Sequence, residues 1–201
     1  MTARFGRSVL GAAIALAGLA VPAGAQEFSN GYTFIKAVKE RDGAKVDTLL
    51  RAPGSTVNSA KEQGSGNGAL HIVTLDRDLN WVGYLIGKGV KVDSRNNQGN
   101  TALALAAQLG WVEGAQLLLQ RSAGVNAANS RGETPLILAV QKRDLPMVRL
   151  LLSRGADPRY TDSVAGYSAI DYAKRDGRAA AIVKLLEAPA GAPMRMQGPT
   201  L

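Results

Sequence analysis

The sequence predicts an all-α solenoid of about five helix-turn-helix units, stacked side by side and joined by short β-turn fingers. Three observations predict this fold. An apolar pattern recurs every 33 residues, each period carries two helical apolar stripes, and a glycine marks the turn before each period. Neither stripe is long enough to form a stable helix alone in water, so each unit must pack on its neighbours.

The period is visible in both stripes. In the first stripe the equivalent residues are Leu70, Leu103, Leu136 and Ile170. In the second stripe they are Leu85, Leu118, Leu151 and Leu185. The turn glycines are Gly66, Gly99, Gly132 and Gly166. A less regular first unit places Phe34 and Val46 in the same two stripes, 36 residues ahead of the next unit instead of 33.

Within one unit, the local sequence accounts for each helix. Thr134 can cap a first helix that has Pro135 in its first turn, where a missing N–H costs nothing. A break at residues 142–144 precedes a second helix, which tolerates Pro146 in its first turn. Gly155 follows that helix at the position of a left-handed C-cap. The unit is therefore predicted to be a helical hairpin.

The first 25 residues have the pattern of a secretory signal. Arg4 and Arg7 precede 13 apolar residues at positions 9–21, and small residues at Ala23–Ala25 suit cleavage after Ala25. Thirteen residues rise only about 20 Å as a helix, which is too short to cross a membrane. We expect a product without stable membrane insertion in the periplasm of a Gram-negative bacterium, with an extracellular location as second choice.

The remaining chain divides in a simple way. Residues 26–31 are expected to be a linker, residues 32–188 the repeat domain, and the Pro/Gly-containing residues 189–201 a disordered tail. The expected units are residues 32–63, 64–96, 97–129, 130–162 and 163–188.

Composition excludes several kinds of chemistry. The sequence has no cysteine and one histidine, which excludes disulfides, thiol catalysis and cysteine-ligated metals. After removal of the signal the net charge is +6, with both signs interspersed, so no basic stripe for nucleic acid is predicted. The segment "GSGNG" at 64–68 lacks the residues that a phosphate-binding loop needs, and is expected to be a turn. No metal or cofactor is expected.

At "GETPLILAV" and "VRLLLSRGADP" the sequence closely resembles the ankyrin repeat, from about Tyr32 to Ala188. The Thr-Pro pair of the family is complete only in the unit at Gly132, and the family's histidine is present only as His71. The resemblance implies a monomeric protein-binding scaffold without catalysis. It also implies that His71 bonds neighbouring backbone. Similar exported bacterial proteins support secreted enzymes such as catalase or serve as immunity factors, and both roles stay open.

The resemblance also implies the contact surface, formed by the ends of the first helices on a concave face and by the finger turns. The expected protein-binding residues are Leu75, Asp76, Gln98, Asn100, Gln108, Leu109, Trp111, Arg131, Glu133, Gln141, Lys142, Tyr167 and Arg175. Within this set Trp111 is expected to be partly exposed, whereas Trp81 is expected in the core. Two rival hypotheses remain: an enzyme or small-ligand site around His71, Asp76 and Gln108, and adhesion to acidic envelope polymers.

Overall fold

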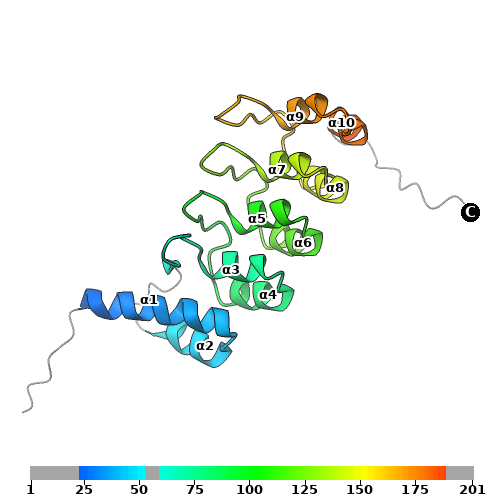
Figure 1. The fold of residues 1–201 in the computed structure, drawn as a ribbon. Helices are drawn as coiled ribbons and strands as arrows, with labels where there is room; N and C mark the ends of the chain where they lie inside the picture. Colours follow the sequence, from blue (N-terminus) through cyan, green and yellow to red (C-terminus); the bar gives the residue numbers. More distant parts are fainter. Residues whose placement is uncertain (1–22, 53–58, 189–201) are drawn as a thin grey trace, which may run out of the picture.

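The computed structural model describes residues 23–52 and 59–188 and confirms the all-α solenoid (Figure 1). The signal expected at 1–25 falls mostly, and the tail expected at 189–201 entirely, outside the described residues. The helices within them are α1 (Ala23–Glu40), α2 (Gly43–Arg51), α3 (Ala69–Leu75), α4 (Leu79–Gly87), α5 (Ala102–Leu109), α6 (Val112–Gln120), α7 (Pro135–Gln141), α8 (Leu145–Ser153), α9 (Ala169–Arg175) and α10 (Ala180–Leu186).

Successive helix pairs stack in one direction along the chain, and the finger turns project from the same side of the stack (Figure 1). The first helices of each pair pack on one another, α3 on α5, α5 on α7 and α7 on α9. The second helices pack on one another in the same way. Helix α1 is longer than the others and includes residues 26–31, the segment expected as a linker. Its Gly31 lies against Ala60, in the segment that leads from the first unit to the second.

Short side chains cap many of the helices, and the predicted cap at Thr134 is confirmed. Thr101, Thr134 and Ser168 begin α5, α7 and α9, and each side-chain oxygen accepts the backbone N–H three residues later. Aspartates perform the same task for second helices: Asp42 caps α2, Asp78 caps α4 and Asp144 caps α8. The predicted left-handed glycine after α8 is confirmed, since Gly155 has φ +84°.

The apolar stripes form one continuous core through the stack. The repeated leucines of the three central units are at most 1% exposed, and Phe34 and Val46 join the core from the first unit. In the last unit the packing differs, because Leu186 is buried while Leu185 is only partly buried. That unit has no following neighbour among the described residues, so its helices cover the end of the core instead of filling its middle.

Three arginines link one unit to the next at the turn between the two helices. Arg41, Arg77 and Arg143 have left-handed φ values of 60°, 54° and 57°, respectively. Arg41 donates to Asp76 and Asp78, Arg77 to the backbone oxygen of Leu109 at 2.6 Å, and Arg143 to Asp176. The equivalent residue between α5 and α6 is Gly110 (φ +64°). These contacts add directional polar links to a stack that apolar packing holds together.

Candidate protein-binding surface

We call the finger turns together with the first helix of each pair the finger-side face. At its C-terminal end, the structure brings together several of the residues predicted to bind protein. Arg131 pairs with Glu133 at 3.2 Å, and the Gln141 amide donates to the same carboxylate at 3.3 Å. In the next unit, the Arg175 guanidinium carbon lies over the Tyr167 ring, 4.7 Å from its centroid. Residues from two finger turns and two helices therefore form one cluster.

Tyr172, which sequence reasoning missed, joins the two halves of this cluster, because Gln141 and the charge of Glu133 also act on its hydroxyl. Its ring packs edge-on to Tyr167 with the centroids 5.6 Å apart, and its hydroxyl donates to Asp162 at 2.8 Å. Burial raises the pKa of Tyr172, and the hydrogen bond to Asp162 adds to this effect. We call Arg131, Glu133, Gln141, Tyr167, Tyr172 and Arg175 the Tyr/Arg cluster. The equivalent residues in earlier units are Ile72, Leu105 and Leu138, so the pattern predicted an apolar residue at Tyr172.

In this region two carboxylates are buried, whereas several basic side chains are exposed. Glu133 and Asp162 are each only 4% exposed, whereas the Arg131 side chain is 65% exposed. Burial alone would raise the pKa of Asp162, but the N–H groups of Ala165 and Val164 and the Tyr172 hydroxyl together lower it. Both carboxylates are thus held inside by several donors. Arg175 and Lys142 are exposed to solvent.

The N-terminal end of the finger-side face differs, because its charges pair with one another. Lys39 bonds Glu62, and Arg41 bonds Asp76 at 2.9 Å. Leu75 is 44% exposed and gives this end an apolar residue. The other predicted residues here lie at the ends of the helices or on a finger: Gln108 and Leu109 are partly buried, and Gln98 is exposed.

Three predicted contact residues are buried, so they cannot touch a partner directly. The expectation that Trp111 is partly exposed is wrong, since it is 6% exposed. Its ring lies over Gly114, where a Cβ would come within 2.1 Å of the ring atom Cε3. Asn100 is 1% exposed and bonds Asn129 of the next finger, and Glu133 is 4% exposed and bonds Asn129 of its own finger.

Trp81, which was expected in the core, is only partly buried and packs against the edge of the core. The Arg41 guanidinium lies 5.5 Å from the Trp81 ring centroid, and Tyr84 packs edge-on at 4.9 Å. The sequence places Trp81 and Gly114 at equivalent positions, and the missing side chain at Gly114 lets Trp111 take that space. The two tryptophans have therefore exchanged the environments that their positions predicted.

An asparagine ladder holds the fingers together. Asn96 donates to Asn67 at 3.0 Å, and one unit later Asn129 donates to Asn100 at 3.0 Å. Backbone bonds run beside it, from the N–H of Asn97 to Ser65, of Ser130 to Gln98 and of Ser163 to Arg131. The recurrence of asparagine at both positions was the available sequence signal. The fingers therefore form a connected edge and not a set of separate loops.

The rival catalytic site does not come together. His71 is 1% exposed; its Nδ1 accepts the Gly68 N–H at 3.1 Å, and its Nε2 lies 2.8 Å from the Asn100 oxygen. Burial lowers the pKa of His71, which favours the neutral ring. Asp76 lies at the opposite end of α3 and pairs with Arg41. His71 thus bonds backbone, as the resemblance implied.

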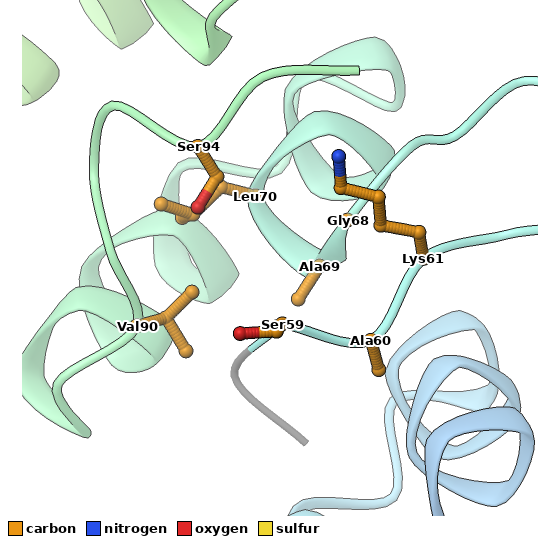
Figure 2. Close-up of a pocket in the computed structure, with 8 residues that line it drawn as sticks. All are labelled: Ser59, Ala60, Lys61, Gly68, Ala69, Leu70, Val90 and Ser94. Carbon is orange, nitrogen blue, oxygen red and sulfur yellow. The ribbon is translucent and has the colours of Figure 1, made fainter. Parts of the chain in front are cut away.

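A small pocket lies beside the start of α3 (Figure 2). Its lining consists of Ser59, Ala60, Lys61, Gly68, Ala69, Leu70, Val90 and Ser94. The empty space is about 290 Å³ and includes open solvent, so it falls below the usual size of a ligand site. A search of the described residues finds no group of three or more His, Cys, Asp or Glu side chains that could hold a metal.

Comparison with known families agrees with this architecture. A family model described as ankyrin repeats, in three copies, matches residues 34–129 and also residues 70–162. Together the two matches cover well over half of the chain. Within the residues that the structure describes, none of the helices combines the length and apolar character that a membrane span requires. Ankyrin repeats generally mediate protein–protein interaction and are typically non-catalytic. The chain belongs to the ankyrin-repeat family.

Proposed function

We propose that this chain binds another protein through its finger-side face, using the concave arrangement of that face and the finger turns, and that it catalyses no reaction. The Tyr/Arg cluster is the observation that carries the proposal. Tyrosine and arginine are enriched among the residues that contribute most to protein interfaces, because they combine a large contact area with directional hydrogen bonds. Here Tyr167 and Arg175 are positioned against each other before any partner arrives.

Pre-organisation supports the same proposal. The fingers are tied by the asparagine ladder and by backbone bonds between neighbours. Binding to a surface that is already ordered loses less conformational entropy than binding to free loops. A repeat scaffold also presents side chains from successive units in fixed register, which suits an extended contact.

The proposed site of action is the periplasm, with an extracellular location as second choice. The support is the signal-like pattern of residues 1–25, in which two arginines precede a short apolar segment and small residues. In this proposal the acting form starts at Gln26, is a monomer, and supports or inhibits a secreted protein. Growth-medium and periplasmic fractions, analysed by immunoblotting and N-terminal sequencing, test both the location and the cleavage point.

Affinity capture tests the binding function. The chain from Gln26 onward is used as bait in a periplasmic extract, beside the double variant Arg131→Ala/Tyr167→Ala and the control Arg121→Ala/Arg154→Ala. The control removes two exposed arginines that follow α6 and α8, away from the finger turns. We expect one partner, identified by mass spectrometry, to bind the original chain and the control but not the double variant. Equal capture by all three chains contradicts the proposal, provided that their melting temperatures agree.

A further inference from the structure

We infer that the partner presents an acidic segment to the Tyr/Arg cluster, where Arg175 lies over the Tyr167 ring and the neighbouring unit exposes Arg131 and Lys142. This inference rests on the proposed function and adds the chemical class of the partner. It also places the contact at one end of the finger-side face, over α7, α9 and the fingers that precede them.

The first argument is the separation of charge in depth. Glu133 and Asp162, the buried anionic groups of this region, already accept several hydrogen bonds: Glu133 from Arg131, Asn129 and Gln141, and Asp162 from Tyr172 and two backbone N–H groups. The cationic groups point to solvent. A partner approaching this end therefore meets positive charge first, and complementary negative charge on the partner is favoured.

The second argument is that two of these cations have no acidic partner. Among the described residues, neither Lys142 nor Arg175 forms an ion pair, although neighbouring basic residues do: Arg143 bonds Asp176, and Lys174 bonds Glu187 at 2.8 Å. The nearby exposed carboxylate of Asp171 accepts from the N–H and hydroxyl of Ser168. At the other end of the face, Lys39 and Arg41 are both paired. At the C-terminal end, no ion pair within the described residues neutralises the exposed charges of Lys142 and Arg175.

The third argument is the orientation of Arg175. Its guanidinium carbon lies over the Tyr167 ring, and Tyr167 is held edge-on against Tyr172, whose hydroxyl is bonded to Asp162. A guanidinium that contacts a ring in this way keeps N–H groups from which a carboxylate can accept two bonds. Holding the side chain in this way reduces the entropy lost when a carboxylate binds. Exposed Arg121 and Arg154 lie at helix C-termini, as Lys142 and Arg175 do, so the interaction with the helix dipole does not distinguish the two pairs.

A peptide titration tests the inference without knowledge of the natural partner. The probes are two capped eight-residue peptides, one alternating Glu and Ala and the other alternating Gln and Ala, added to ¹⁵N-labelled chain from Gln26 onward. We expect the acidic peptide alone to shift the amide signals of Arg131, Tyr167 and Arg175. The variant Lys142→Gln/Arg175→Gln should bind about fivefold more weakly, as two lost exposed ion pairs imply, and higher salt should weaken binding further.

The variant Arg121→Gln/Arg154→Gln is the matched control, because it removes the same amount of positive charge from the ends of α6 and α8, which we call the outer helices. Its affinity for the acidic peptide should stay unchanged. Equal weakening of both variants, equal binding of the two peptides, or signals that shift only outside residues 130–188 would overturn the inference. If the captured partner requires Arg131 and Tyr167 but tolerates Lys142→Gln/Arg175→Gln, the proposed function stands and the acidic segment is wrong. If capture is indifferent to every variant, the proposed function itself fails.

Discussion

Thr74 carries a buried side-chain oxygen that has no hydrogen-bond partner among the described residues. The residue is 0% exposed on α3. The equivalent positions in the next two units hold the buried apolar residues Ala107 and Val140. A hydroxyl in such a place loses its hydrogen bonds to water and gains none in return.

The substitution Thr74→Val should therefore stabilise the fold by about 1 kcal/mol, because valine keeps the shape and removes the unsatisfied group. The matched control is Thr134→Val, at another fully buried threonine, whose oxygen accepts the Ile137 N–H at 3.3 Å. This second change should cost about 1 kcal/mol through loss of the helix cap. Urea unfolding measures both. A destabilised Thr74→Val variant would contradict the account.

His71 makes the free energy of unfolding depend on pH near neutrality. Histidine is the side chain that ordinarily titrates there, and the sequence has one histidine. Burial lowers the pKa of His71 in the folded protein below its unfolded value of about 6.5. As pH falls through 6.5, the unfolded chain takes up a proton that the folded chain resists. Stability is therefore present above about pH 6.5 and is lost below it.

Chemical unfolding at pH 8, 7, 6 and 5 should show this loss, with a slope no steeper than about 1.4 kcal/mol per pH unit, the limit for one proton. The variant His71→Ala should be less stable at pH 8 and should show no slope between pH 7 and 5. Carboxylates with lowered pKa values, such as Asp47 and Glu62, act only at lower pH. A persistent slope in His71→Ala would exclude His71 as its source.

The fate of single residues was the least predictable part of the structure. The sequence correctly predicted that His71 bonds backbone and that Thr134 caps a helix. The predicted environments of Trp81 and Trp111 were wrong. Both depend on the space over Gly114, which Trp111 fills from one helical turn away. The cluster role of Tyr172 was hidden for a similar reason, since Asp162 and Tyr167, its hydrogen-bond and ring partners, lie in the finger that precedes α9.

At the scale of elements, neighbouring fingers stack so closely that the turn glycine touches the next finger. A Cβ on Gly132 would lie 2.5 Å from the Ser163 nitrogen, and one on Gly99 the same distance from the Ser130 nitrogen. Gly166 occupies the equivalent turn of the last unit, with nothing within 4 Å of its Cβ position. Both Gly132 and Gly166 have positive φ, 76° and 68°.

Substitution at these two glycines separates crowding from backbone strain. Gly166→Ala should cost about 1 kcal/mol, from the left-handed conformation alone. Gly132→Ala should cost more, roughly 2 to 4 kcal/mol, because the fingers must also move apart. Thermal unfolding of the two variants measures the difference. Equal costs would show that the fingers are not in tight register.

Helices and caps were predictable because they depend on residues three or four apart in the chain. The ladder of fingers was not, because Asn67 and Asn96, or Asn100 and Asn129, are separated by 29 residues and look like ordinary polar turn residues. For the same reason Asn100 and Glu133 were expected to contact a partner. The structure shows that they position the fingers from within.

For the whole molecule, the period of 33 residues was sufficient to predict the solenoid, because stacked units contact mainly their neighbours. This organisation has a consequence for dynamics. Helices α5 and α7 have a neighbouring unit on both sides and six buried residues each, whereas α10 ends the stack. Hydrogen exchange should be slowest in α5 and α7 and fastest in α10. Equal exchange rates in all helices would contradict the claim that packing against neighbouring units determines local stability.

The binding face could be located only in part from the sequence, since the surface residues of a solenoid follow from the fold but their burial does not. The most direct test of the account is site-specific photo-crosslinking in cells that produce the full chain. The crosslinker p-benzoylphenylalanine replaces exposed Ser130, Ser163 or Val164 of the fingers, which leaves the Tyr/Arg cluster intact, and Arg121 or Arg154 as controls. The account predicts one discrete adduct from the first three positions and none from the two on the outer helices. Equal adducts from both sets, or none from the finger-side face, would contradict it.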